Sequence, residues 1–295
     1  MAFLTVRYED TQGNLKTERA HFIDRQIAVQ PGQVFIRDRF VGSGKNGTVY
    51  SCHRDGERDR GTLAVKFLHV LTPNRLARFD FECRILEGLS HPNVLKLIGA
   101  GEVETTFRMS AVPFLVTDLM QGNLRGRVDH GGPLSAQELQ EVAIQICDGF
   151  AHVHAQGVIH RDIKPDNFLL HNGQVKIADF GFAKTVTDEG DARFYRSDIS
   201  GFDEAIGPQA FMSPELHRYA KNKSVTVDQR SDLFQIGANF WYLLTGNPPV
   251  GLIDVADDPT GGIWFPVIEK CIRSRPELRY QSAGELAEAV RRLKC

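Results

Sequence analysis

The residues best suited to chemistry lie in two short segments of the second half of the chain. Residues 160–167 read His-Arg-Asp-Ile-Lys-Pro-Asp-Asn, and residues 179–181 read Asp-Phe-Gly. Between them, apolar runs at 168–170 and 174–178 flank His-Asn-Gly and predict a tight hairpin. This layout sets two acids, an amide and a lysine on neighbouring loops. Such a set suits phosphoryl transfer, which depends mainly on positioning and on neutralising charge.

A glycine-rich segment, residues 42–49 (GSGKNGTV), follows the pattern GxGxxGxV. Its three glycines let backbone N–H groups approach phosphates without a Cβ in the way. The segment lies between two strand-like runs, so it does not fit a dinucleotide-binding fold, and it lacks the GK[ST] ending of a Walker loop. Taken alone, it also fits an ordinary glycine-rich hairpin turn.

Lys66 ends an otherwise apolar strand-like run, residues 63–66 (LAVK). An unpaired ammonium is costly to bury, so this lysine is expected to have a partner or to lie at a ligand. Glu82, among apolar neighbours on the following predicted helix, is the natural partner. A lysine that snorkels to the surface is the alternative.

The elements that position these residues change in type along the chain. Strand-like runs lie in 34–70, 94–103 and 112–119, and helical periodicity lies in 74–89, 135–156 and beyond 228. Asn74 is the expected N-cap of the first helix, and Ser135 with Glu138 fits a capping box. A β-rich part with one helix therefore precedes a helix-rich part. This order predicts two lobes, whose junction is a favoured place for a ligand cleft.

Residues 1–33 stand apart from this pattern. Strand-like runs at 3–8 and 14–23 flank a turn-like Asp-Thr-Gln-Gly, and Pro-Gly at 31–32 marks a break. An accessory hairpin packed on the next domain and a partly mobile terminus are both compatible with this sequence.

Composition excludes several other classes of protein. The 295 residues carry a formal net charge of −2, which gives no general attraction to nucleic acid or to an anionic membrane. The five cysteines are scattered without metal-ligand spacing, as suits a reducing compartment. No apolar run approaches the roughly 18 residues of a membrane span, and the first residues lack the pattern of a signal peptide. We expect a cytoplasmic protein; the sequence does not indicate an oligomeric state.

In combination, these segments resemble those of eukaryotic-type serine/threonine protein kinases over about residues 34–293. Residues 279–283 (RYQSA) resemble bacterial members. The resemblance implies a bilobal α+β fold, with an antiparallel sheet and one helix in an N-lobe (34–117), a hinge (118–121) and a mainly helical C-lobe (122–293). Residues 1–33 would be an N-terminal extension.

The implied reaction moves the γ-phosphate of ATP, with Mg²⁺ or Mn²⁺, to serine or threonine hydroxyls of protein substrates, the chain's own activation loop included. Asp162 would orient the hydroxyl and accept its proton, and Lys164 would contact the γ-phosphate. Asn167 and Asp179 would hold the metal. The implied nucleotide-binding residues are Gly42, Ser43, Gly44, Gly47, Val49, Ala64, Lys66, Glu82, Asp118 and Met120.

The resemblance extends to scaffold residues. Ser213-Pro214-Glu215 stands where the family has A-P-E, and Glu215 is expected to pair with Arg279. Asp232 resembles the acid that holds the backbone of the catalytic loop. Between residue 249 and the amphipathic run at 264–274, a short turn-rich stretch replaces a helix that relatives use for docking.

Two features leave the acceptor and the activity open. Pro208 stands where serine/threonine kinases usually have threonine and resembles tyrosine kinases, whereas Lys164 is typical of serine/threonine kinases. The main alternative to an active kinase is a pseudokinase, which usually lacks the lysine, the catalytic acid or a magnesium ligand. Here all of these are present: Lys66, Glu82, Asp162, Asn167 and Asp179. A small-molecule kinase would have glycine in place of Arg161 and no A-P-E segment.

The candidate phosphate acceptors of the activation loop are Thr185, Thr187, Tyr195, Ser197 and Ser200.

Overall fold

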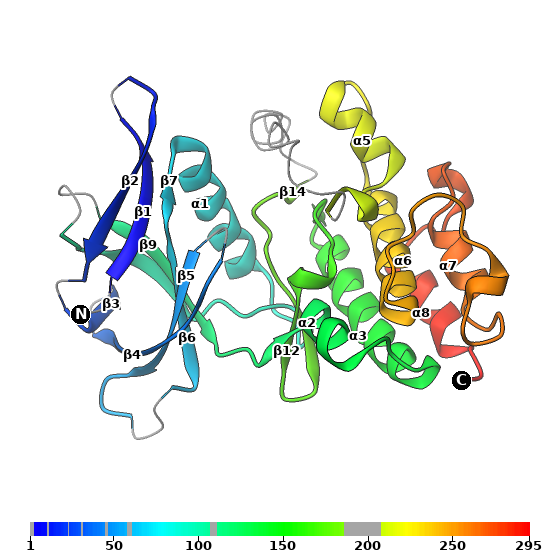
Figure 1. Cartoon of the computed structure of the whole chain (residues 1–295), viewed down its shortest axis with the longest axis horizontal. Helices are drawn as coiled ribbons and strands as arrows, with labels where there is room; N and C mark the ends of the chain where they lie inside the picture. Colours follow the sequence, from blue (N-terminus) through cyan, green and yellow to red (C-terminus); the bar gives the residue numbers. More distant parts are fainter. Residues whose placement is uncertain are drawn as a thin grey trace. The chain divides into compact units, whose positions relative to one another are not determined.

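The computed structural model describes residues 3–10, 12–22, 24–30, 32–44, 47–57, 61–106, 111–185 and 208–295. The chain divides into two compact units. Unit 1 comprises Met1–Gly88 and Lys96–Met120, and unit 2 comprises Leu89–Leu95 and Gln121–Cys295. Unit 1 is mainly sheet and unit 2 mainly helix, which confirms the predicted α+β class (Figure 1).

Unit 1 is built on a six-stranded antiparallel sheet in the order β3-β4-β5-β6-β9-β8. The strands are β3 (Gln26–Gln30), β4 (Gln33–Ser43), β5 (Gly47–Arg54), β6 (Leu63–Leu68), β8 (Gly99–Val103) and β9 (Val112–Asp118). Successive side chains of a β-strand point to opposite faces of the sheet. Phe35, Phe67 and Phe114 fill the core on one face of this sheet.

A second sheet of unit 1 comes from the start of the chain. Strands β1 (Phe3–Glu9) and β2 (Leu15–His21) form an antiparallel hairpin, and β1 also pairs in parallel with the short strand β7 (Val70–Leu71). Leu4, Val6 and Ala20 of the hairpin are buried in the same core cluster as Phe35.

Helix α1 (Pro73–Gly88) begins one residue before the predicted N-cap Asn74. The amide of Leu76 donates to the carbonyl of Thr72 at 3.0 Å, so the chain is already helical from Pro73. The expectation of a cap at Asn74 was therefore wrong. Proline at the first helical position is favoured because its fixed φ suits the helix and its missing N–H costs nothing there.

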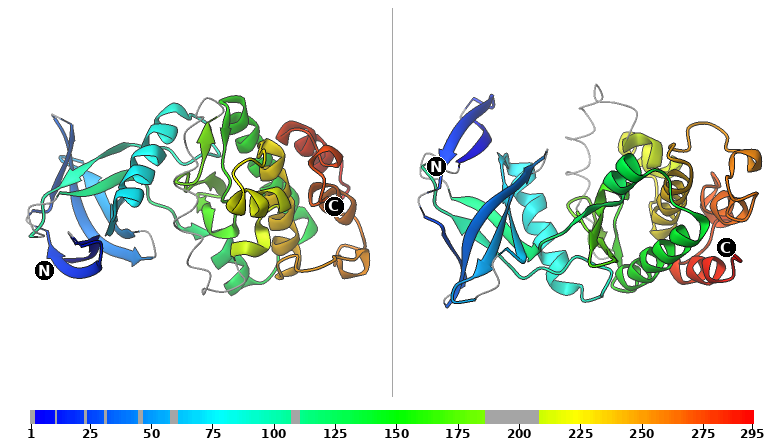
Figure 2. Two further views of the ribbon diagram at one scale, coloured as in Figure 1. Left: turned by 90° about the horizontal axis from the view of Figure 1, so that it is seen from above. Right: turned by 60° about the horizontal axis from the view of Figure 1, so that its bottom comes forward.

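Unit 2 is an assembly of helices around α3 and α6. The helices are α2 (Leu124–Gly131), α3 (Ala136–Ala155), α5 (Pro214–Lys221), α6 (Gln229–Thr245), α7 (Phe265–Cys271) and α8 (Ala283–Arg291). The capping box of Ser135 and Glu138 is confirmed at the start of α3. Helix α8 packs along α3 (Figure 2). Gln140 Nε2 of α3 donates to the carbonyls of Val290 and Leu293. Helix α7 is shorter than the predicted 264–274 run, and Trp264 beside it is fully buried.

Short strands and turns carry the loops of unit 2. Strands β10 (Gly122–Asn123), β12 (Phe168–His171) and β13 (Gln174–Ile177) form one small sheet, and β11 (Val158–Ile159) pairs with β14 (Lys184–Thr185). The predicted hairpin around His-Asn-Gly is confirmed as β12–β13. Single 3₁₀ turns lie at η1 (Pro165–Asn167), η3 (Pro208–Phe211), η4 (Val255–Asp257) and η5 (Pro276–Leu278). Among the helices that the structure describes, none combines the length and hydropathy needed to span a membrane.

Candidate active site

The loop between β11 and β12 brings three predicted site residues of unit 2 together. Lys164 Nζ donates to Asp162 Oδ2 at 2.7 Å. Asn167 Nδ2 donates to the backbone carbonyl of Asp162 at 2.8 Å and approaches its Oδ2 at 3.4 Å. The side chains of Asp162 and Lys164 remain about one quarter exposed, at 25% and 24%. A carboxylate is thus held with its lysine at a surface that a substrate can reach.

Asp232 of α6 holds the backbone of this loop by hydrogen bonds. Its Oδ2 accepts the amide of His160 at 2.8 Å and its Oδ1 accepts the amide of Arg161 at 2.9 Å. His154 Nε2 of α3 also donates to Oδ2, at 2.9 Å. Asp232 is fully buried, so these three donors compensate the cost of burying its charge. The predicted role of Asp232 in holding the loop is confirmed.

Two further residues of α6 hold the middle of the loop. Gln235 Oε1 accepts the amide of Ile163 at 2.7 Å, and Asn239 Nδ2 donates to the carbonyl of Ile163 at 3.2 Å. Asp232, Gln235 and Asn239 lie at helical spacings of three and four, so they share one face of α6. Neither Gln235 nor Asn239 was predicted from the sequence to hold the loop. The signal was present, because both are polar residues on the apolar face of a buried helix.

Asp179 follows β13 and lies close to the loop. The amide of Ala178 donates to the carbonyl of Asn167 at 3.0 Å, and His160 Nε2 donates to the carbonyl of Ala178 at 3.0 Å. Arg161 and Asp179 both have φ of 66°, in the left-handed region that non-glycine residues seldom adopt. Backbone strain of this kind is kept where the surrounding structure over-determines the conformation, commonly at functional sites.

The charges at the loop reinforce one another. Burial lowers the pKa of Lys164, but the negative charges of Asp162 and Asp179 and the hydrogen bond to Asp162 outweigh burial, so its pKa is raised. Lys164 is therefore an ammonium at all physiological pH values. It lies where it can neutralise negative charge on a transferred group.

Asn167 offers a side-chain oxygen that can serve as a ligand of a divalent cation. Within the described residues, no hydrogen bond occupies Asn167 Oδ1, although Asn167 is buried. Nor do the described residues contain a cluster of three or more His, Cys, Asp or Glu side chains placed for a metal. Mg²⁺ suits such a site because it binds through one or two protein oxygens while keeping water and phosphate ligands.

Arg161 connects the loop to the start of the activation segment. Its Nε donates to the carbonyl of Phe182 at 2.8 Å and its Nη2 to the carbonyl of Ala183 at 2.9 Å. Thr185 ends β14. The other candidate acceptors, Thr187, Tyr195, Ser197 and Ser200, lie outside the described residues, as does the side chain of Pro208.

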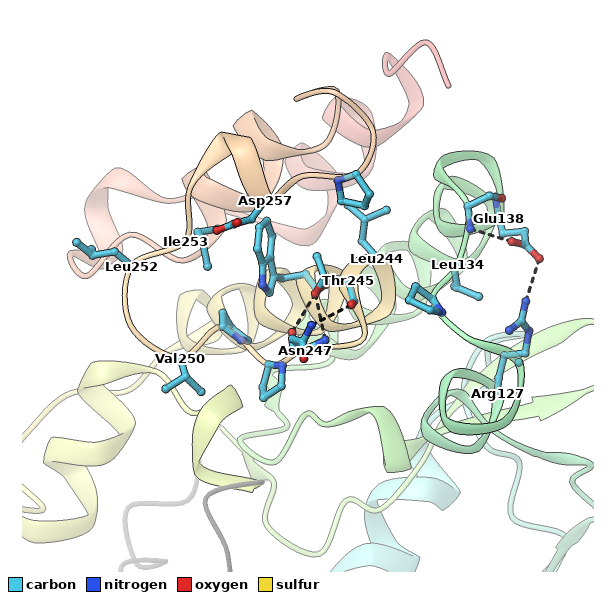
Figure 3. A pocket seen from close by; sticks show the side chains of 17 residues that line it. Arg127, Leu134, Glu138, Leu244, Thr245, Asn247, Val250, Leu252, Ile253 and Asp257 are labelled. Carbon is cyan, nitrogen blue, oxygen red and sulfur yellow. Dashed lines mark hydrogen bonds and ion pairs between the residues drawn. The ribbon is translucent and has the colours of Figure 1, made fainter.

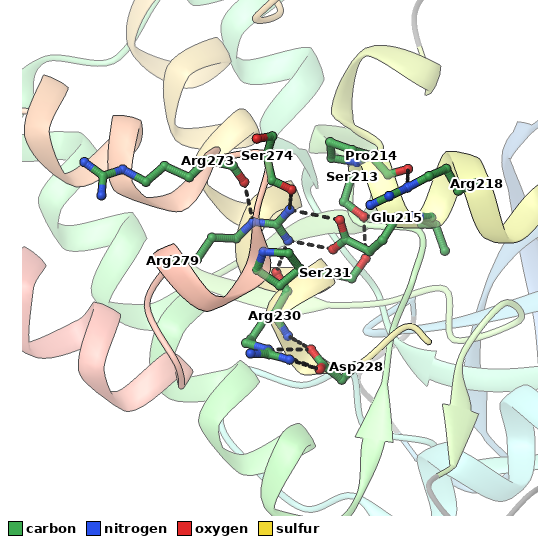
Figure 4. A network of polar contacts seen from close by, with 12 residues as sticks. Ser213, Pro214, Glu215, Arg218, Asp228, Arg230, Ser231, Arg273, Ser274 and Arg279 are labelled. Atoms are coloured by element: carbon green, nitrogen blue, oxygen red, sulfur yellow. Dashed lines mark hydrogen bonds and ion pairs between the residues drawn. The ribbon is translucent and has the colours of Figure 1, made fainter. Parts of the chain in front are cut away.

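The end of the activation segment is anchored by a buried ion pair. Arg279 Nη1 and Nη2 donate to Glu215 Oε1 and Oε2 at 2.6 and 2.9 Å, which confirms the predicted pairing (Figure 4). Arg279 also donates to the carbonyls of Arg230 and Arg273, at 2.8 and 2.7 Å. Ser213 Oγ accepts the amide of Leu216 and so caps α5. This network joins α5, α6 and the turn before α8.

In unit 1, the glycine-rich segment forms the turn of the β4–β5 hairpin. Gly42 pairs with Val49 and Ser43 with Thr48, and the amide of Gly44 donates to the carbonyl of Gly47 at 3.0 Å. A Cβ on Gly47 would lie 2.5 Å from the carbonyl oxygen of Phe67, whereas the Cβ positions of Gly42 and Gly44 face open space. Packing between β5 and β6 therefore requires glycine at 47 alone.

Lys66 and Glu82 both belong to unit 1. Lys66 is half-buried on β6, and Glu82 is buried on α1. Burial raises the pKa of the neighbouring Cys83 thiol to about 12; Glu82 adds to this rise and Lys66 opposes it. Both charges are therefore close to Cys83.

The remaining nucleotide-side residues lie on adjoining strands of the same sheet. Ala64 pairs with Thr117, and Val49 pairs with Lys66. Asp118 ends β9, Leu119 donates its amide to the carbonyl of Thr62 at 3.0 Å, and Met120 is the last residue of unit 1.

A second polar cluster in unit 2 was not predicted. Arg125 Nε of α2 donates to Asp166 Oδ2 at 2.8 Å, and Arg125 Nη1 lies 3.4 Å from the hydroxyl of Tyr242. That hydroxyl donates to Asp129 Oδ1 at 3.0 Å. The cluster supports the loop beside Asn167. Its members come from α2, η1 and α6, which are far apart in the sequence, so no local pattern could reveal the cluster.

A groove of about 830 Å³ opens elsewhere on unit 2, where the turn-rich stretch after residue 249 passes the ends of α2, α3 and α6 (Figure 3). Leu134, Leu244 and Ile253 line it, and an ion pair between Arg127 and Glu138 of 3.2 Å lies at one end. Leu252 is fully exposed beside it.

Comparison with known proteins supports the reading of these motifs. Residues 35–261 match the family model described as protein kinase domain. Over 282 residues the chain is 32% identical to a Corynebacterium glutamicum protein named Probable serine/threonine-protein kinase PknB, covering 87% of this chain and 41% of that protein. It is 30% identical over 262 residues to Serine/threonine-protein kinase PknB of Mycobacterium leprae, covering 81% of this chain and 39% of that protein.

A Streptomyces coelicolor protein named Probable serine/threonine-protein kinase SCO3848 is 31% identical over 268 residues, covering 83% of this chain and 38% of its own. The chain thus spans about two fifths of the length of these relatives. Because the family model covers most of the chain and includes both the glycine-rich turn and the loop of Asp162, the chain belongs to the protein kinase domain family.

Proposed function

We propose that this chain transfers the γ-phosphate of ATP to serine or threonine hydroxyls of proteins. The observation that carries the proposal is the hydrogen bond from Lys164 Nζ to Asp162 Oδ2, on a loop held by the buried Asp232. The names of the similar bacterial proteins, which are serine/threonine kinases, support the same reaction.

Asp162 is the residue that would act on the acceptor hydroxyl. Its carboxylate orients the hydroxyl, and late in the transfer it takes the hydroxyl proton as the oxygen bonds to phosphorus and the bond from phosphorus to ADP breaks. Lys164 neutralises the negative charge of the phosphoryl group during the transfer. The raised pKa of Lys164 keeps the required charge in place.

Asn167 and Asp179 are the residues that would hold a divalent cation, Mg²⁺ or Mn²⁺. The bound cation would supply charge neutralisation on the phosphate oxygens. The glycine-rich turn and Lys66 would bind the phosphates of the nucleotide, with Glu82 orienting Lys66. Ala64, Val49 and the segment from Asp118 to Met120 would contact the adenine.

Lys164 favours serine or threonine as the acceptor, whereas Pro208 alone favours tyrosine. Lys164 is the stronger guide because its charge lies beside Asp162, at the group that acts on the acceptor. Phosphorylation of the chain's own activation loop is part of the proposal, since this segment carries several hydroxyls and begins at residues tied to Arg161. Mass spectrometry that finds no loop phosphate in a fully active preparation would contradict this part.

The test measures transfer of labelled γ-phosphate from ATP with Mg²⁺ to the chain itself and to a generic basic protein. Wild type should transfer, and Asp162→Asn should lower the rate by about 10²–10⁴-fold because the general base is lost. Asp148→Asn makes the same chemical change in an exposed ion pair with Arg291 and should have no effect. Phosphoamino-acid analysis then identifies the acceptor.

Phosphotyrosine alone would overturn the serine/threonine assignment. Nucleotide binding without transfer would instead make the chain a pseudokinase, whose function would be to present a surface.

A further inference from the structure

The N-terminal hairpin of β1 and β2 lies outside the part of the chain that matches the family model, which begins at residue 35. Its strand β1 nevertheless pairs with β7, a strand that follows directly after β6. Arg7 pairs with Val70 and Tyr8 with Leu71, and the amide of Arg7 donates to the carbonyl of His69 at 2.7 Å. The hairpin therefore holds the backbone that joins β6 to α1 (Figure 1).

This joining segment is very short. Strand β7 ends at Leu71, and Thr72 already accepts the amide of Leu76 in the first turn of α1. Leu71 packs against two core clusters: that of Leu4 and Val6, which includes the hairpin, and that of Phe79, which includes α1. A displacement of β7 would thus be passed to the start of α1 without a flexible linker to absorb it.

The hairpin itself is anchored at its other end to the main sheet. The amide of His21 donates to Thr106 Oγ1 at 2.8 Å, and the amide of Thr106 donates to the carbonyl of His21 at 2.9 Å. The ring of Phe22 lies 4.7 Å from that of Phe67, the residue after Lys66, and the guanidinium of Arg37 lies 4.2 Å above Phe22. Anchoring at two ends gives the hairpin a fixed position from which it can restrain β7.

We propose that this hairpin is a built-in positioning element for α1, and through α1 for Glu82. Glu82 is buried on the face of α1 that also carries Phe79 and Cys83, so its place relative to Lys66 depends on where α1 sits on the sheet. Inside unit 1, β7 contacts the start of α1 and is itself paired with β1, while Leu76 of α1 also packs against the cluster of Leu68 and Leu115. The role assigned to Glu82 rests on the proposed function, but the mechanical coupling of hairpin and helix does not.

Hydrogen exchange on the whole chain tests the coupling without reference to activity. Arg7→Pro removes the amide that bonds to His69, and Arg7→Ala keeps that amide while removing the same exposed side chain. Arg7→Pro should speed exchange of the α1 amides by about tenfold or more, and leave α3 and α6 of unit 2 at wild-type rates. Arg7→Ala should exchange like wild type.

A milder variant keeps the test decisive if the proline prevents folding. Thr106→Val removes the hydroxyl that accepts the His21 amide and preserves the shape of the side chain. It should speed exchange of α1 in the same direction by a smaller factor. Wild-type exchange of α1 in a folded Arg7→Pro variant, or in Thr106→Val if the proline variant does not fold, would overturn the proposal.

A double-mutant cycle with Glu82→Gln separates positioning from general stability. If the hairpin acts on transfer through Glu82, Arg7→Pro should lower kcat/KM for ATP about tenfold in wild type but leave Glu82→Gln unchanged. If Arg7→Pro lowers kcat/KM for ATP equally in wild type and in Glu82→Gln, the hairpin has only a structural role and does not position Glu82.

The two measurements, phosphate transfer and hydrogen exchange of α1, test the proposed activity and the coupling of the hairpin to α1 separately. If the wild-type chain transfers no phosphate but Arg7→Pro still speeds hydrogen exchange of the α1 amides, the proposed kinase activity is wrong and the coupling of the hairpin to α1 stands. If the wild-type chain transfers phosphate but Arg7→Pro leaves hydrogen exchange of the α1 amides unchanged, only the coupling of the hairpin to α1 is wrong.

Discussion

Arg279 holds Glu215 by two hydrogen bonds, of 2.6 and 2.9 Å, in which each guanidinium nitrogen meets its own carboxylate oxygen. Both side chains are almost fully buried, at 0% and 5% exposure. The remaining donors of Arg279 reach the backbone carbonyls of Arg230, Arg273 and Ser274. One arginine therefore ties the end of the activation segment to α6 and to the turn after α7.

Glu215→Gln should lower the free energy of unfolding by about 3–5 kcal/mol, because it leaves the guanidinium of Arg279 buried without its counter-charge. Urea denaturation measures the loss. Glu269→Gln removes an equivalent carboxylate from the exposed pair with Arg273 and should cost less than about 0.5 kcal/mol. Equal losses in the two variants would show that burial does not strengthen the pairing.

Asp232→Asn should reduce kcat by about 10²-fold and leave KM for ATP near the wild-type value. Asparagine has one acceptor oxygen, so one of the amides of His160 and Arg161 would face an NH₂ group, and the loop of Asp162 would shift. Steady-state kinetics on the folded variant provide the measurement. Asp228→Asn, which alters the half-buried N-cap of the same helix, is the matched control. A wild-type kcat in Asp232→Asn would contradict the role of this carboxylate.

Gly47→Ala should destabilise the chain by about 1–3 kcal/mol, since the added Cβ would overlap the carbonyl of Phe67 and force β5 away from β6. Gly44→Ala adds the same methyl group to open space in the same turn, and its unfolding free energy should stay within about 1 kcal/mol of wild type. Thermal or urea unfolding compares the two. Similar stability in both variants would mean that β5 relaxes freely at this position.

The cysteines should differ sharply in reactivity. Burial raises the pKa of the Cys52 and Cys83 thiols to about 12, and it raises those of Cys147 and Cys271 as well, whereas Cys295 is exposed. At pH 8 the native chain should take up one alkyl group, at Cys295, and five in denaturant, as intact mass spectrometry can show. Rapid labelling of a second cysteine in the native chain would contradict this burial.

The same shifts predict a loss of stability at high pH. The unfolded thiols ionise near pH 9, and the folded ones only at higher pH, so the folded state binds more protons above pH 9. The free energy of unfolding should therefore fall as pH rises above about 9. Replacing Cys52 with alanine should make the free energy of unfolding fall less steeply with rising pH. The cavity that this substitution leaves lowers stability by the same amount at every pH, so it does not affect the slope.

Much of this protein could be predicted from residues close together in the sequence. The loop of Asp162 and Lys164, the β12–β13 hairpin and the capping box of Ser135 follow from short-range patterns that fix backbone conformation locally. The pairing of Glu215 with Arg279 was predictable only through the family resemblance, because the two residues come together from separate helical segments.

What only the tertiary structure decided depends on contacts between distant segments. The parallel pairing of β1 with β7, the support of the loop by Gln235 and Asn239, and the pair of Arg125 with Asp166 have no local signature. Even the start of α1 differed from the local prediction by one residue. The sequence determined which side chains are available for the proposed chemistry, because these groups are set by residue type and short spacing. The fold determined what holds those groups in place, because packing and buried hydrogen bonds depend on which segments meet in space.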